Sequence, residues 1–80
     1  MDTETITLDR LTIGSKAIVH KLKQGRGIKR RLLDLGFTPG AITETVLKSP
    51  GQDPTAYLIR GAVIALRSED ARLVLCTIKR

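Results

Sequence analysis

Residue types that carry out catalysis or bind metal ions are scarce in this 80-residue sequence. It has one histidine, one cysteine and one methionine, which are His20, Cys76 and Met1. A nucleophilic mechanism needs a nucleophile, a base and a group that orients the base. A closed zinc site needs four ligands, usually clustered cysteines and histidines. We therefore predict no catalytic residue, no metal site and no cofactor, and we expect a chain that binds a partner and is not an enzyme.

The lone histidine and cysteine have simpler structural interpretations. His20 lies in a predicted strand, and with a carboxylate such as Asp53 it would form at most an adventitious metal site. Cys76 lies in an apolar segment, which is typical of a small buried hydrophobic side chain. Gly25 and Gly27 are not followed by the Lys-Ser/Thr pair of a phosphate-binding loop. None of these residues predicts a site of its own.

A run of basic residues from Arg26 to Arg31 is the feature that most strongly indicates function. The chain carries a formal net charge of +6, which favours nucleic acid, anionic lipid or an acidic protein surface as partner. Positive charge in the first turn of a helix opposes the helix dipole. Two interpretations stay open, a solvated helix face and a positive patch that docks on an acidic protein surface. In the second, the partner-binding residues are Lys21, Lys23, Arg26, Lys29, Arg30, Arg31 and Phe37.

Other ligands fit this composition less well. Binding of single-stranded nucleic acid uses aromatic rings on which bases stack, and the chain has only Phe37 and Tyr57. Phosphate contacts alone would give salt-sensitive binding without sequence preference. A groove for proline-rich peptides also needs several aromatic side chains. Nucleic acid is therefore the second hypothesis for the basic patch, and a proline-rich ligand is disfavoured.

The basic run must be positioned by a short helix. Apolar residues spaced i, i+4, i+7 predict a helix at 27–35. Gly36 can take the left-handed conformation just past its end, which lets Phe37 fold back on the helix. Residues 38–41 have proline second and glycine third, which predicts a type II turn.

Short strands account for most of the remaining chain. Alternating apolar residues and breakers predict strands at 16–23, 42–48, 57–59, 62–66 and 73–78. Residues 1–5 are expected to be a frayed tail, and 6–11 an arm held by its leucines. Ser68 is expected to cap a one-turn connector. Five strands with one early helix favour a small closed or half-closed barrel in one domain over 1–80, with an aliphatic core because aromatics are only 2%.

The last predicted strand, 73–78, is apolar on both faces apart from Thr77. Such a strand is either buried on both faces or offers one face to a partner. Weak self-association through this strand therefore stays open. The polar, acidic N-terminus lacks the pattern of a secretory signal, and no apolar run approaches the roughly 20 residues of a membrane span. We expect a cytoplasmic protein.

Five motifs, in order, resemble the FeoA family of small cytoplasmic accessory proteins of bacterial ferrous iron uptake. They are Leu11-x-x-Gly14, Arg31-Leu32-x-x-Leu35-Gly36-Phe37-x-Pro39-Gly40, Asp53-Pro54, Tyr57-x-x-Arg60-Gly61 and Ala65-Leu66-Arg67-x-x-x-Ala71. The resemblance covers residues 8 to about 78 and extends to the C-terminal barrel of iron-dependent repressors. It implies a mainly β, SH3-like barrel of five to six short strands, with one short α-helix inserted after the first barrel strand.

The resemblance also implies a partner. Family members act on the membrane ferrous iron transporter near its cytosolic GTP-binding domain, so the chain would be an accessory or regulatory protein that binds there. An arginine finger offered in trans to that domain needs one exposed arginine, and Arg26, Arg30, Arg31 and Arg60 are candidates. The alternative is a stand-alone basic regulatory or nucleic-acid-binding barrel. Whether the partner is activated, inhibited or assembled is left open.

Overall fold

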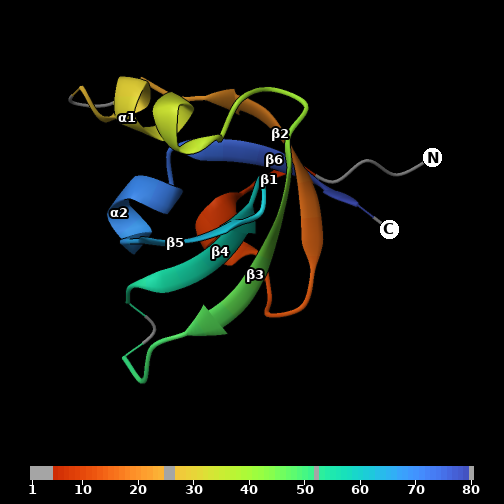
Figure 1. Ribbon diagram of the computed structural model, residues 1–80, viewed down its shortest axis with the longest axis vertical. Coiled ribbons are helices and arrows are strands. Elements are labelled where there is room, and N and C mark those ends of the chain that lie inside the picture. The colour runs from red at the N-terminus through yellow and green to blue at the C-terminus, as the bar shows by residue number, and fades with distance from the viewer. Residues whose placement is uncertain (1–4, 25–26, 52, 80) are drawn as a thin grey trace.

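The computed structural model describes residues 5–24, 27–51 and 53–79, and its strands form one curled antiparallel sheet (Figure 1). The strands are β1 (Thr5–Thr7), β2 (Lys16–Leu22), β3 (Ile42–Lys48), β4 (Thr55–Ile59), β5 (Ala62–Leu66) and β6 (Val74–Lys79). They lie in the order β1-β6-β2-β3-β4-β5. The helical elements are η1 (Leu8–Arg10), α1 (Ile28–Leu35) and α2 (Ser68–Ala71). The predicted mainly β fold with a helix after the first barrel strand is confirmed.

The described part of the N-terminal segment begins with a paired strand at Thr5. Residues 1–4 lie outside the described part, but Thr5 begins β1, which pairs with β6. The chain then turns through η1, and Leu8 and Leu11 are both buried, as predicted. The backbone pairing of β1 with a strand about 70 residues away could not be inferred from its own three residues.

Two irregularities in the sheet help it to curl. The register shifts in β2 between Val19 and Lys21, and in β3 between Thr45 and Leu47. A bulge of this kind bends the strand that carries it and increases its twist. In Figure 1 the strands accordingly wrap around a common interior.

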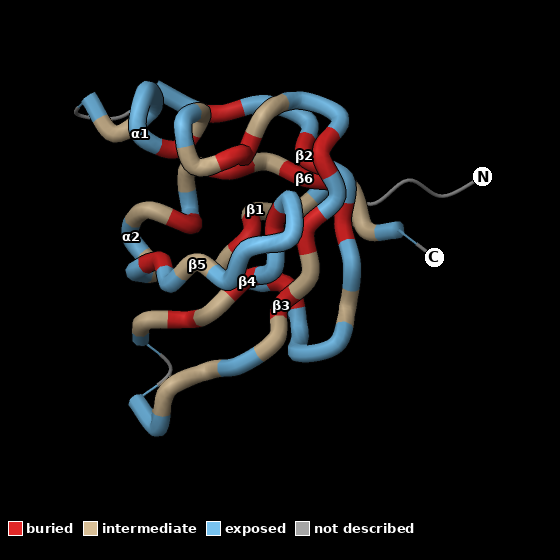
Figure 2. The backbone as a smooth tube through the Cα atoms, in the orientation of Figure 1, coloured by how far each residue is buried: buried red, intermediate tan, exposed pale blue. Residues whose placement is uncertain are grey.

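The core contains both aromatic residues, so the expectation of a purely aliphatic core is wrong. Tyr57 and Phe37 are the largest fully buried side chains, and they share the core with aliphatic residues. Buried positions, red in Figure 2, occur along most of the strands. Strand β3 also buries Thr43 and Thr45, whose hydroxyls donate to backbone carbonyl oxygens at 2.9 and 3.3 Å. These hydrogen bonds offset the cost of burying a polar group. As a result, β3 directs its isoleucine, Ile42, outward.

The turns around α1 follow the predicted chemistry. Gly36 has φ +115°, its N–H donates to Leu33 O, and the N–H of Phe37 donates to Leu32 O, each at 3.0 Å. These two bonds make a Schellman motif. The type II turn that follows has φ +91° at Gly40 and closes with a 3.0 Å hydrogen bond between its first and last residues.

Helix α2 is fixed by a residue from another loop and not by its own serine. Arg67 is the N-cap residue and makes no side-chain cap hydrogen bond, so the prediction that Ser68 caps this turn is wrong. Instead, the Asp53 carboxylate accepts hydrogen bonds from the Ser68 N–H at 2.9 Å and from its hydroxyl at 3.2 Å. The loop before β4 is thereby attached to the start of α2.

Strand β6 is an inner strand of the sheet. It lies between β1 and β2 and is paired with both. Its alternate residues Val74 and Cys76 are buried in the core. Leu75, on its other face, is only partly buried, as is Ile78 near the end of the strand, so the strand is not fully buried on both faces. β1 covers one edge of β6 at residues 75–77 and β2 covers the other.

Candidate partner-binding surface

The exposed basic residues of α1 lie at one end of the molecule. Lys29, Arg30 and Arg31 are all exposed, and no acidic residue lies in the first turn of the helix. Arg30 approaches Asp34 at 3.6 Å, with both side chains at least 70% exposed. An ion pair this exposed contributes little stability. Arg30 therefore remains available to a partner.

Strand β2 brings two further lysines to the same end. Lys21 follows the bulge in β2, and Lys23 is fixed by a 2.7 Å hydrogen bond from its N–H to Leu73 O. Both lysines are exposed, and Figure 1 shows β2 running toward the end of the molecule that carries α1. Arg26, predicted as part of this patch, lies outside the described residues. We call Lys21, Lys23, Lys29 and Arg30 the basic face.

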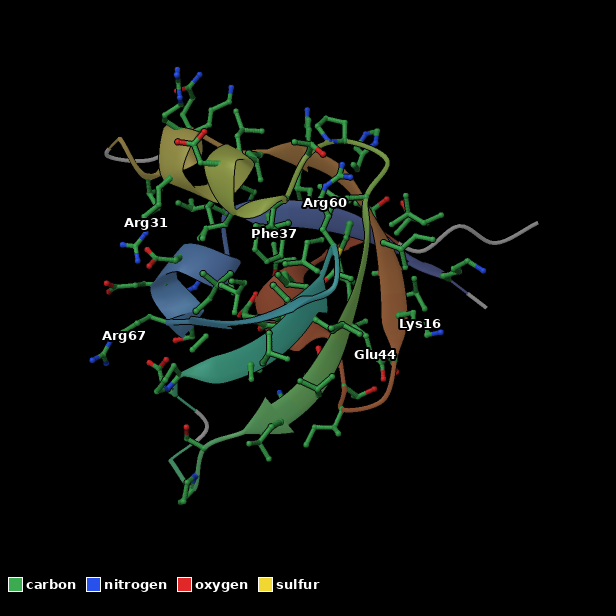
Figure 3. All side chains as sticks on the ribbon, in the orientation of Figure 1. Lys16, Arg31, Phe37, Glu44, Arg60 and Arg67 are labelled. Carbon is green, nitrogen blue, oxygen red and sulfur yellow. The ribbon has the colours of Figure 1, made fainter. Side chains whose placement is uncertain are left out.

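Arg31 points elsewhere, into a groove between α1 and α2. The groove has a volume of about 320 Å³. Its lining combines apolar side chains of α1 and of the end of β5 with charged residues just after β5 and in α2, namely Ile28, Leu32, Leu35, Leu66, Arg67 and Asp70. Figure 3 shows Arg31 directed from α1 toward α2. The groove thus offers a partner apolar contacts next to the basic face.

Phe37 does not belong to the surface. Its side chain is fully buried beneath α1 and Figure 3 shows it inside the barrel. The expectation that Phe37 contacts a partner is therefore corrected, because a ring with no exposed area holds the helix in place and touches no partner. With Tyr57 buried as well, neither aromatic residue is available for stacking on bases or for packing on proline.

Arg60 has a structural role that the sequence did not reveal. It occupies a left-handed conformation, φ +48°, in the two-residue turn between β4 and β5. Its Nε donates to Gly36 O at 3.3 Å and its Nη2 donates to the Thr38 hydroxyl at 2.6 Å. Arg60 therefore joins this hairpin to the end of α1. The only available signal was an arginine where such turns prefer asparagine, aspartate or glycine.

The two residues considered for metal binding have different surroundings. Asp53 is engaged with Ser68, and His20 is exposed on β2. Across 5–24, 27–51 and 53–79, no three histidine, cysteine, aspartate or glutamate side chains gather where they could hold an ion. Within these same ranges, no helix is long and apolar enough to span a membrane.

Cys76 and Tyr57 are buried groups that keep their protons. Burial raises the pKa of the Cys76 thiol from 9.0 to about 11, and its Sγ donates to Ile6 O at 3.6 Å. Burial likewise raises the pKa of Tyr57 from 10.0 to about 12, and its hydroxyl donates to Leu8 O at 3.4 Å. The predicted role of Cys76 as a small buried hydrophobic residue is confirmed, since a protonated, enclosed thiol is a poor nucleophile.

The architecture is that of a small SH3-like barrel with one basic helix at its end. A family model for the FeoA domain matches residues 6–78. The chain therefore belongs to the FeoA family.

Comparisons with individual proteins agree with this assignment. The chain is 35% identical over 65 residues to the Fe(2+) transport protein A/Fe(2+) transporter FeoB fusion protein of Porphyromonas gingivalis. That match covers 80% of this chain, which spans only 8% of the length of the fusion protein. The FeoA of Stenotrophomonas maltophilia, a procaryotic SH3 domain protein solved in complex with zinc, is 31% identical. Its TM-score is 0.82, over 89% of this chain and 88% of that one.

A more distant likeness concerns the fold alone. IdeR of T. acidophilum superposes with a TM-score of 0.81 at 19% identity, over 99% of this chain and 36% of that one. The predicted similarity to the barrel of iron-dependent repressors is confirmed at the level of fold.

Proposed function

We propose that this chain is a non-enzymatic accessory protein of ferrous iron uptake that binds the cytosolic part of a membrane ferrous iron transporter with a GTP-binding domain. The observation that carries the proposal is the 35% identity to a protein in which transport protein A is fused to the transporter FeoB. A fusion holds its two parts at high effective concentration. The fusion therefore supports a contact, in the cytoplasm, between a surface of this chain and a transporter of that kind.

The basic face and the neighbouring groove supply such a surface. Exposed charges at the rim of an interface set orientation and association rate more than affinity, a role that suits Lys21, Lys23, Lys29 and Arg30. Apolar contacts contribute most of the binding energy. The partly buried Ile28 and Leu35 line the groove beside these charges. We therefore place the contact on α1 and the end of β2, with an acidic surface of the transporter opposite.

The test reverses charge on the helix. The double variant Lys29→Glu/Arg30→Glu should bind the transporter's purified cytosolic domain at least about tenfold more weakly at low salt, chiefly through slower association. The matched control is Arg10→Glu/Lys79→Glu, which makes the same charge change at exposed positions outside α1 and β2. Circular dichroism shows whether each variant is folded. Equal affinities for wild type and the α1 variant would remove the basic face from the interface.

Two further measurements on the same samples separate the remaining hypotheses. Titration with duplex and single-stranded DNA should show no binding, whereas micromolar binding with a steep salt dependence would indicate a nucleic-acid module instead. The GTP hydrolysis rate of the cytosolic domain should be the same with wild type as with Arg30→Ala or Arg31→Ala at saturation. A large loss of stimulated hydrolysis with either variant would identify an arginine acting in trans.

A further inference from the structure

The sheet formed by β2 to β5 exposes apolar side chains on the surface opposite to the core. Val63 is 63% exposed, Leu47 64% and Ile42 49%, and two more residues, Ile18 and Leu58, are each 37% exposed. Isolated exposed apolar residues are common, but a contiguous group of them marks an interaction surface. We call Ile18, Ile42, Leu58 and Val63, together with Lys16 and Glu44, the outer face.

The strand register shows that the outer face is contiguous. Ile18 of β2 lies directly opposite Ile42 of β3. In the next row along, Glu44 of β3 lies between Lys16 of β2 and Leu58 of β4. Val63 of β5 extends this row beyond Leu58. Residues directly opposite one another on one face of an antiparallel pair have neighbouring side chains, so these two rows form one surface.

The outer face carries one charge of each sign at the β2 end of the row that contains Leu58, where Lys79 of β6 lies on the other side of Lys16. Lys16 and Glu44 lie opposite each other on adjacent strands, and Figure 3 shows both on the same side of the molecule. Among the described residues, however, they form no ion pair within 4.0 Å. Both charges are therefore available to a partner. A hollow of about 190 Å³, lined in part by Lys16, Glu44 and Leu58, gives this face room to receive a side chain.

We propose that the outer face binds a second copy of this chain. A symmetric dimer requires a surface that is complementary to itself. A two-fold axis parallel to the strands, lying above the outer face midway between β2 and β3, stacks each of these two strands over the other strand of the second copy. It places Lys16 against Glu44 of the second copy, and Ile18 against Ile42, and each contact occurs twice. A partner of uniform charge would meet one of these two residues with a repulsive contact.

The dimer is weak and independent of the proposed transporter contact. Four apolar side chains with two ion pairs make an interface at the small end of the range for specific complexes. The outer face shares no residue with the basic face. Loss of one interaction should therefore leave the other intact.

A charge exchange tests the proposal. Sedimentation velocity of the full chain from about 10 µM to about 1 mM should show a monomer–dimer equilibrium. Lys16→Glu and Glu44→Lys should each raise the dissociation constant at least about tenfold, because both copies of the ion pair become repulsive. The double variant Lys16→Glu/Glu44→Lys exchanges the two charges and should restore the wild-type constant. Lys29→Glu, on α1, should leave it unchanged.

Each other outcome overturns the proposal. A wild-type chain that stays monomeric throughout this range has no such dimer. If the dimer forms equally well with Lys16→Glu or Glu44→Lys, it uses a different surface. If the double variant is folded but stays monomeric, Lys16 does not pair with Glu44 of the second copy. A monomeric wild type whose Lys16→Glu variant no longer binds the transporter would assign the outer face to the transporter. Thermal unfolding of every variant confirms that each is folded.

Discussion

Gly36 ends α1 in a conformation and a space that a side chain would not fit. Its φ is +115°, and a Cβ there would lie 3.2 Å from Arg60 Cδ and 3.3 Å from Ile59 Cγ1. We expect Gly36→Ala to lower the free energy of unfolding by about 1–3 kcal/mol. Gly40→Ala is the matched control, since Gly40 also has positive φ but no atom within 4 Å of its Cβ position. Chemical denaturation should show the larger loss for Gly36→Ala, and equal losses would mean that the contact with Arg60 and Ile59 is unimportant.

The buried thiol of Cys76 and the buried phenol of Tyr57 should lower the free energy of unfolding at alkaline pH. In the folded state the pKa of Cys76 is about 11 and that of Tyr57 about 12, against ordinary values of 9.0 and 10.0. Because the unfolded chain loses these protons first, their contribution to stability is complete below pH 9 and is lost as pH rises through 11 and 12. The urea midpoint should fall from about pH 8 to about pH 11, and fall less in Cys76→Ala. A midpoint that is flat over this range would contradict the account.

At the scale of single residues, the sequence predicted the backbone conformation of turn residues better than it predicted side-chain contacts. Gly36 and Gly40 take the backbone conformations that their turns require, because local sequence determines such turns. The hydrogen bonds of Arg60 reach residues more than 20 positions away in the chain, and Phe37 is buried as a member of the core cluster. Those contacts are fixed by tertiary packing, which local patterns do not encode. For this reason Phe37 was wrongly predicted as a partner contact.

The basic residues at the start of helix α1 lower the stability of the helix. Its first turn contains basic residues and no acidic one, an arrangement that the helix dipole disfavours. Lys29→Glu should therefore raise the free energy of unfolding by about 0.3–1 kcal/mol while weakening transporter binding. Lys79→Glu, outside any helix, should not give this gain. A less stable Lys29→Glu variant would show that Lys29 supports the fold, which would contradict a role confined to binding.

Helix α2 depends on the loop that precedes β4. Removing both hydrogen bonds to Ser68 through Asp53→Ala should cost about 1–2 kcal/mol of stability, as for loss of a helix cap. Asp34→Ala, which removes only the exposed ion pair on α1, should cost about 0.5 kcal/mol or less. Denaturant unfolding of the two variants makes the comparison. Equal costs would show that the attachment of Asp53 to α2 contributes nothing beyond surface charge.

At the scale of elements, the spacing of apolar residues was sufficient to predict α1 and the five longer strands. Each was predicted within about two residues of its observed bounds, since apolar spacing directly reflects which side chains face the core. Strand β1 was missed because three residues carry no measurable period, and its pairing with β6 is long-range. The bulges in β2 and β3 were also missed, because they are defined by the pairing between strands and not by the pattern within one strand. They matter because the bulge in β2 immediately precedes Lys21.

The whole molecule presents two surfaces that differ in chemistry. The basic face lies at the end that carries α1, and the outer face lies on the sheet formed by β2 to β5 (Figure 1). The number and spacing of strands predicted a small barrel. The outer face could not be predicted, because it depends on which residues of neighbouring strands lie opposite one another. The identity of the partner rests on likeness to known proteins and not on any pattern in the composition.

The central claim is that this chain binds the cytosolic part of a ferrous iron transporter. Isothermal titration of the purified chain into the GTP-binding cytosolic domain of the transporter from the same organism tests it most directly. We predict saturable binding that weakens as salt is raised from about 50 mM to about 500 mM, because exposed charges on the basic face are screened. Absence of binding at low salt, with both proteins folded and the domain active on GTP, would contradict the claim.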